Sequence, residues 1–229
     1  MRKKMECLDR NSSSAVSALD KNLLDVVHAL MAPMEKRDPY TFGHQTRVTR
    51  LAVAIAAEMG LAQDRIDGLK LAASIHDIGK IVIPFEILNR PTQLSEVEFT
   101  LVKMHPQVAF DMLSSISFRW PVAKIVRQHH ERADGSGYPS GLKSGQTLLE
   151  AKILAVADVV EAMSSHRPYR ASLGIDAALD EVSNKSGVLY DAEAVAACIR
   201  LLLIKNFSLE GNLPSVWQSA NPFTPVKAP

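Results

Sequence analysis

Apolar residues recur at helical spacing along most of the chain. One apolar stripe runs through residues 21–37 and stops at an Arg-Asp-Pro step, and a second follows Gly43 and ends near Gly60. Each stripe predicts an amphipathic helix, because residues three and four apart share one helical face. The same spacing predicts further helices over these segments: 64–78, 95–105, 121–132, 150–165, 175–185 and 191–205.

Several residues mark where these helices begin. Ser95 with Glu98 forms a capping-box pattern, and Pro121 suits a first helical turn. Residues 150–165 are apolar on nearly all sides, which predicts a central buried helix. The strand signal is weak, because the candidate 79–84 is short and bounded by Gly and Pro. We therefore predict an all-α fold, a single-domain helical bundle of about eight helices.

Composition and charge narrow the class of protein. Of 229 residues, 47% are hydrophobic and 22% charged, and the formal net charge of +1 gives no field that selects a nucleic acid polymer or a membrane. Cys7 and Cys198 are far apart, which indicates free thiols in a reducing compartment. The start lacks the apolar run of a signal peptide, so a cytoplasmic location is expected. We expect a polar tail over 1–20, a catalytic domain over 21–205 and a Pro-rich tail over 206–229.

Histidines and carboxylates supply the candidate chemistry. A single helical histidine is more often a hydrogen-bonded or surface residue than a ligand, so the argument rests on grouping. His76 and Asp77 are adjacent, His129 and His130 are adjacent, and Asp158 lies within a very apolar run. A buried aspartate is costly unless a cation or several donors meet it. Imidazole with carboxylate suits divalent Fe, Mn, Co, Ni or Zn, and a two-metal site suits phosphoester hydrolysis.

Five motifs then carry a resemblance to a known family. "HDIGK", the His105-Pro106 step, "HHE", "DGSGYP" and "ADVVEAM" followed by "RPYR" occur in this order. With its motifs in this order and at similar spacing, the chain resembles the HD-GYP family over roughly residues 22–203. The resemblance implies an all-α bundle of the HD-domain type. It also implies a bacterial phosphodiesterase that hydrolyses cyclic di-GMP at a centre of two or three metal ions, often iron or manganese.

The resemblance also assigns roles to residues. It implies six metal ligands: His76, Asp77, His105, His129, His130 and Asp158. Asp77 would bridge two ions and act in catalysis together with Lys80, which would contact the scissile phosphate. We expect two divalent transition-metal ions per chain, Fe or Mn first and Co, Ni or Zn as alternatives.

Other residues are expected to bind the substrate or support the ligands. Gly137 and Tyr138 would line the nucleotide site, with Tyr138 stacking or hydrogen bonding rather than acting as a base. Arg167 and Arg170 match positions that contact phosphates, and two arginines one turn apart suit a phosphodiester. Glu131 is expected to be exposed and to orient an imidazole.

Some positions depart from the family pattern. Tyr40 stands where members with three metals carry a glutamate, so a two-metal site is expected, with His44 near the site or as an extra ligand. His166 replaces an aspartate found in many relatives. Val82 and Phe85 replace small and acidic residues, which alters the expected rim of the site.

The predicted reaction is attack by a metal-bridging hydroxide on cyclic di-GMP, giving linear pGpG and, by further hydrolysis, GMP. Two other functions stay open at this point: an inactive cyclic di-GMP sensor or partner-docking module, and an HD phosphohydrolase acting on another nucleotide. A diguanylate cyclase domain or a sensor or receiver protein is a candidate partner by family analogy. A homodimer is also open.

Overall fold

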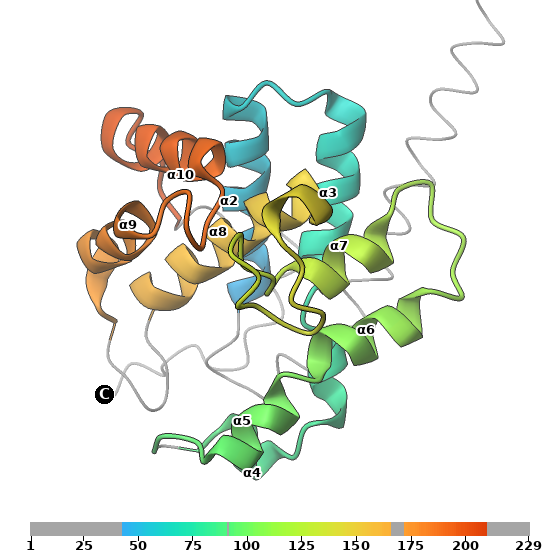
Figure 1. Cartoon of the computed structure of the whole chain (residues 1–229). Coiled ribbons are helices and arrows are strands. Elements are labelled where there is room, and N and C mark those ends of the chain that lie inside the picture. The colour runs from blue at the N-terminus through green and yellow to red at the C-terminus, as the bar shows by residue number, and fades with distance from the viewer. Residues whose placement is uncertain (1–42, 91, 166–171, 210–229) are drawn as a thin grey trace, which may run out of the picture.

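A computed structural model describes residues 43–90, 92–165 and 172–209, and their regular secondary structure is helical (Figure 1). Their α-helices are α2 (His44–Glu58), α3 (Gln63–Ile75), α4 (Phe85–Leu88), α5 (Glu96–Val102), α6 (His105–Leu113), α7 (Val122–Gln128), α8 (Leu149–Ser164), α9 (Gly174–Asn184) and α10 (Ala192–Ile199). Short 3-10 helices cover Ile78–Val82 (η1) and Ser144–Gln146 (η2), and a π-helical turn, η3, covers Arg200–Ile204. The all-α prediction is confirmed. The helix predicted over 21–37 and the tail over 1–20 lie outside the described residues.

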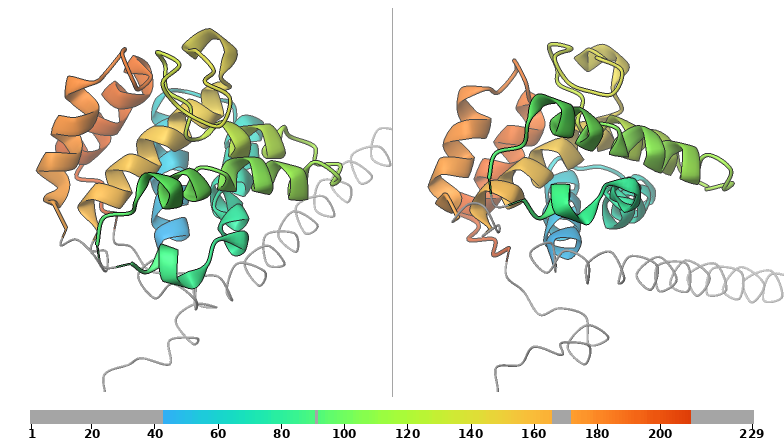
Figure 2. Two further views of the ribbon diagram at one scale, coloured as in Figure 1. Left: turned by 60° about the horizontal axis from the view of Figure 1, so that its bottom comes forward. Right: turned by 90° about the horizontal axis from the view of Figure 1, so that it is seen from below.

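Helix α8 runs through the centre of the bundle. Helices α9 and α10 lie on one side of it and α3, α6 and α7 on the other, as the views in Figure 2 also show. Most α8 residues are buried, including Ile153, Leu154 and Val156 with no exposed surface. The prediction of a central buried helix is therefore confirmed. No helix in the described part of the chain has the length and apolar character needed to cross a membrane.

Three predicted helices end earlier than expected, and a histidine follows each of these ends within three residues. The helix predicted over 64–78 ends at Ile75, so His76 follows its last turn. The helix predicted over 121–132 ends at Gln128, just before His129. The helix opened by the Ser95–Glu98 capping box ends at Val102, and His105 begins a new helix instead of closing the old one. Pro106 explains this last error, because proline fits a first turn, where its missing N–H is not needed.

Gly79 allows η1 to pack directly on the first turn of α6. A Cβ atom built on Gly79 would lie 2.8 Å from the backbone nitrogen of Ala109 and 2.9 Å from the carbonyl carbon of His105. Both distances are shorter than real Cβ contacts, and both neighbours are backbone atoms, which cannot rotate away. Gly79 therefore brings Asp77, at the start of η1, close to His105.

We predict that Gly79→Ala lowers the free energy of unfolding by roughly 1–3 kcal/mol, because overpacking forces backbone shifts. Urea unfolding followed by circular dichroism measures the change. Gly145→Ala is the matched control, since a Cβ atom at Gly145 has nothing within 4 Å. Equal stability of the two variants would contradict this account of the η1–α6 contact.

Candidate metal centre

Three buried histidines share one local arrangement. In each, Nδ1 contacts the carbonyl oxygen of the residue three positions earlier: 2.7 Å from His76 to Ala73, 2.8 Å from His105 to Val102 and 2.5 Å from His129 to Val126. A carbonyl oxygen only accepts hydrogen bonds, so Nδ1 carries the hydrogen in each neutral ring. The Nε2 lone pairs are thereby left for another partner. Carbonyls at helix ends thus set the tautomer that a metal ligand requires.

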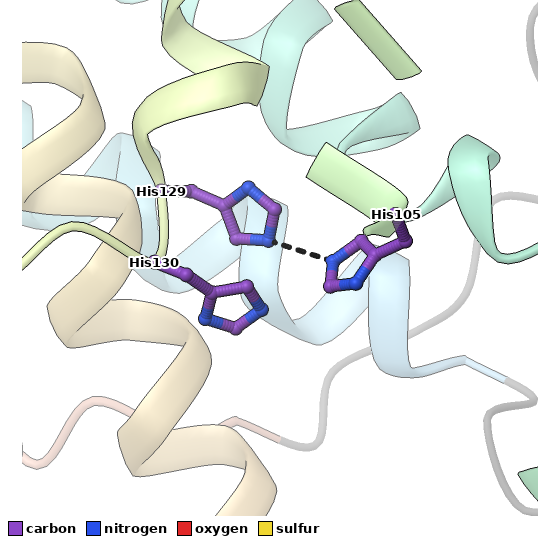
Figure 3. Close-up of side chains that lie close together, drawn as sticks. All are labelled: His105, His129 and His130. Carbon is purple, nitrogen blue, oxygen red and sulfur yellow. Dashed lines mark hydrogen bonds between the residues drawn. The ribbon is translucent and has the colours of Figure 1, made fainter. Parts of the chain in front are cut away.

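The surroundings of these Nε2 atoms fit a cation. Nε2 of His76 is buried without a hydrogen-bond partner. Nε2 of His105 and Nε2 of His129 lie 3.4 Å apart, and Figure 3 shows these two rings meeting while His130 lies beside them. Burial lowers the pKa of His105 to about 4 and that of His129 to about 3, so both rings are neutral at pH 7. Two neutral nitrogens that face each other through lone pairs are favourable only when a cation lies between them.

Asp77 presents its two oxygens to different histidines. Oδ2 lies 3.7 Å from Nε2 of His44 and 3.7 Å from Nε2 of His76, whereas Oδ1 lies 3.4 Å from Nε2 of His105. Lys80 Nζ donates to Oδ2 at 2.7 Å. Burial alone would raise the pKa of Asp77, but the positive charge of Lys80 and, after it, electrostatic interactions with His76, His105 and His44 hold this pKa well below its usual range. The carboxylate is therefore charged and in position to bridge two cations.

Asp158 joins the same cluster from α8. Its Oδ1 lies 3.3 Å from Nε2 of His44 and 3.8 Å from Nε2 of His76. The potential ligand atoms of the described residues gather in three overlapping groups, within 4.8 Å of one another in each group. The groups are His44, His76 and Asp77; His76, His129 and Asp158; and His105, His129 and His130. The structure thus brings the six expected ligands together with His44, which is a full member of the cluster.

Glu161 is a site residue that the sequence analysis missed. It is 1% exposed, and one carboxylate oxygen contacts Nδ1 of His44 while the other accepts a 2.7 Å hydrogen bond from Nε of Arg47. Burial raises the pKa of Glu161, but His44 and Arg47 lower it to about 2. Burial lowers the pKa of His44, yet the carboxylates of Glu161 and Asp158 raise it to about 9. These carboxylates therefore stabilise positive charge at the His44 ring, which a metal ion at Nε2 would also supply.

Glu131 differs from its expected role. It is 4% exposed rather than exposed, and its carboxylate accepts hydrogen bonds from the backbone nitrogens of Ser140 at 2.8 Å and Leu142 at 2.9 Å. No imidazole is among its hydrogen-bond partners in the described residues. A buried carboxylate requires donors, and the loop that follows the two histidines supplies them. Glu131 therefore closes the following loop, residues 132–142, onto the end of α7, and we call this segment the glycine loop.

The glycine loop places Tyr138 beside the cluster. A Cβ atom on Gly137 would lie 2.5 Å from Glu131 Cα and 2.5 Å from the His130 carbonyl oxygen, so Gly137 packs against this backbone rather than lining the cavity. The Tyr138 and His130 ring centroids are 4.7 Å apart with an interplanar angle of 30°. Burial raises the pKa of Tyr138 above its usual value, so its hydroxyl stays protonated at pH 7.

A cavity of about 380 Å³ lies over the cluster. Its polar end is lined by Lys80, His105, His130, Asp158 and Tyr138, and the rest of the described lining is apolar. Lys80 and Tyr138 thus lie where a substrate beside the cluster would meet them. Arg167 and Arg170, which were expected to contact phosphates, lie outside the described residues, as do Tyr40 and His166. Val82 and Phe85 are exposed and do not line this cavity.

The chain is similar to known proteins over most of its length. A family model described as HD domain matches residues 28–194. The chain is 35% identical to the cyclic di-GMP phosphodiesterase response regulator RpfG of Xanthomonas campestris, covering 84% of the chain and 52% of that protein. It is 38% identical to a cyclic di-GMP phosphodiesterase of Thermotoga maritima, covering 88% and 55%.

A third relative, the 3'3'-cGAMP-specific phosphodiesterase 3 of Vibrio cholerae, is 35% identical, covering 80% of the chain and 40% of that protein. Among solved structures, Bd1817, an HDG"Y"P protein from Bdellovibrio bacteriovorus, matches 69% of this chain and 51% of its own with a TM-score of 0.59 and 20% identity. That likeness supports the fold. The chain spans about half the length of the cyclic di-GMP phosphodiesterases of Xanthomonas campestris and Thermotoga maritima.

We predict that Glu161→Gln lowers the affinity for Mn(II) by about 10-fold or more, because residues that orient a ligating histidine typically contribute 10- to 100-fold. Competition with a chelating fluorescent indicator measures the affinity. Glu181→Gln is the matched control, because Glu181 bonds Lys185 and Tyr190 instead of a cluster histidine. The same affinity in both variants would rule out an orienting role for Glu161.

We predict that Glu131→Ala speeds amide hydrogen exchange at Ser140 and Leu142 by about 10-fold or more, because each backbone nitrogen loses its carboxylate acceptor. NMR-detected exchange at single residues measures this. The amide of Leu148, which donates to the side chain of Gln128 at 2.9 Å, is the internal control and should keep its rate. Unchanged exchange at Ser140 and Leu142 would show that Glu131 does not hold the loop.

Proposed function

The chain belongs to the HD-domain family, and we propose that it is a metal-dependent phosphodiesterase that hydrolyses cyclic di-GMP. The observation that carries the proposal is that the two oxygens of Asp77 approach different buried histidines, His44 and His105, of which His105 lines the cavity. Two metals a few ångströms apart serve phosphoester hydrolysis by stabilising the attacking and leaving oxygens. The similarity to proteins named cyclic di-GMP phosphodiesterases supports the choice of substrate.

The donors divide naturally between two ions that share Asp77. One ion would be held by His44, His76, Asp77 and Asp158. The second ion would be held by Asp77, His105, His129 and His130. Imidazole with carboxylate suits Fe or Mn, and also accommodates Co, Ni or Zn. When bound, such ions lower the pKa of coordinated water and neutralise charge on phosphoryl oxygens.

The protein's own groups supply the positioning. Lys80 lines the cavity and bonds Asp77, so its ammonium can donate to a phosphate oxygen beside the cluster. Tyr138 lines the same end with a protonated hydroxyl, which makes it a donor or a stacking surface rather than a base. Glu131 holds the loop that carries Tyr138. Cleavage of one phosphodiester bond gives linear pGpG, and cleavage of the second gives GMP.

The complete donor set favours hydrolysis over a sensor role. A protein that only binds a cyclic dinucleotide has no need for seven buried or half-buried ligand side chains around one point. Burying them without a function would cost free energy, because each buried charged group loses its hydration. We therefore place the chain with the hydrolases among its relatives.

We predict that Asp77→Ala lowers kcat/KM for cyclic di-GMP by more than about 100-fold and removes bound metal, because both ions lose one ligand. Metal analysis and chromatographic detection of pGpG on one anaerobically prepared, Fe(II)- or Mn(II)-loaded sample measure both effects. Asp67→Ala is the matched control, since Asp67 is an exposed residue of α3 that bonds Gln63. Full metal content and turnover in Asp77→Ala would disprove the two-metal proposal.

A further inference from the structure

Helix α5 has no evident role in the hydrophobic core. None of its residues, Glu96–Val102, is buried, and Phe99 is 46% exposed. The start of the helix is nonetheless well defined, because Ser95 and Glu98 form a complete capping box and Arg90 pairs with Glu98 at 2.7 Å. The pictures place α4 and α5 at one end of the molecule, away from α9 and α10 (Figure 1). Because α5 contributes no buried side chain to the core, its apolar side chains are available to contact a ligand.

Helix α5 forms part of the wall of the cavity over the histidine cluster. Phe99 and Val102 of α5 line this cavity together with Leu94, and Val159, Ala162 and Met163 of α8 line it as well. These six side chains offer no hydrogen-bond donor or strong acceptor. The cavity therefore has two chemically different parts: a polar end with Lys80 and the cluster, and an apolar part with one large aromatic ring.

Resting on the proposed function, we propose that Phe99 and the apolar side chains beside it bind one purine base of the substrate. A cyclic dinucleotide has its phosphate and its bases joined through short ribose links, so a phosphate at the polar end leaves a base within the same cavity. Stacking of a base on an aromatic side chain is favourable for every base, because each has a π-face. Met163 is unbranched and adapts to the shape of a flat ligand.

The same subsite should not distinguish guanine from adenine. The two purines differ in the groups at their hydrogen-bonding edges, and reading these groups requires side-chain donors or acceptors. The six apolar side chains provide none, and an apolar pocket rejects a ligand of nearly the same shape only weakly. We therefore expect 3'3'-cGAMP to be hydrolysed with a kcat/KM within about tenfold of that for cyclic di-GMP, since its adenine can occupy this subsite.

The test compares Phe99→Ala, Phe99→Trp and Phe85→Ala in the metal-loaded full chain. Phe85 is the matched control, because it is also 46% exposed but lies on α4 and does not line the cavity. Phe99→Ala should raise KM for both cyclic dinucleotides by about tenfold, with the loss mainly in KM, as expected for one lost base–aromatic stack. Phe99→Trp should keep KM close to that of the wild type, because the indole ring can also stack on a base. Phe85→Ala should have the same KM as the wild type.

Each outcome is decisive. An unchanged KM in Phe99→Ala, with normal metal content, overturns the subsite, as does a KM in Phe99→Trp as high as that in Phe99→Ala. A preference of the wild type for cyclic di-GMP over 3'3'-cGAMP greater than about 100-fold overturns the lack of base discrimination. Absence of wild-type turnover on either cyclic dinucleotide would instead refute the proposed function. In that case equilibrium binding of the non-hydrolysed cyclic dinucleotide to Phe99→Ala and wild type still tests the stacking contact.

Discussion

The burial of so many metal-binding groups at one point is the constraint on which this structure depends. His76, His105 and His129 are at most 1% exposed, and Asp77 is 3% exposed beside them. Removing such groups from water costs several kcal/mol for each charge unless a partner compensates it. Lys80 and the histidines compensate Asp77 in part, whereas the inward-facing Nε2 lone pairs still require a cation. A metal centre satisfies these requirements together, which is why we make it the basis of the function.

The fold meets this constraint mainly through helix ends. His76 follows α3, His105 begins α6 and His129 follows α7, and each ring is oriented by a carbonyl three residues earlier. The close approach at Gly79 then brings the α3 end to α6. Helix α8 completes the cluster with Asp158, and Glu161, one turn later on α8, contacts His44. Packing of apolar helices thus fixes the positions of polar groups that would be unfavourable anywhere else in the core.

The helical spacing of apolar residues was enough to predict the all-α fold. The six candidate ligands followed from the family resemblance, and the structure brings their ligand atoms together. Neither was enough for three residues. His105 was assigned to a helix end because Pro106 also follows many helix ends. Glu161 was missed because a carboxylate three residues after Asp158 gives no sign of its partner, His44, which is 117 residues away. Glu131 was expected to be exposed because the sequence does not indicate its hydrogen-bond partners. These partners are backbone nitrogens nine and eleven residues further along the chain, which the folded loop brings to its carboxylate.

The most direct test of the account is anomalous X-ray diffraction from crystals of the full chain loaded with Mn(II) under anaerobic conditions. We predict two anomalous peaks that share Asp77, one beside His44, His76 and Asp158 and the other beside His105, His129 and His130. A single peak that does not contact Asp77, or peaks only outside this cluster, would contradict the central claim that Asp77 bridges two metal ions.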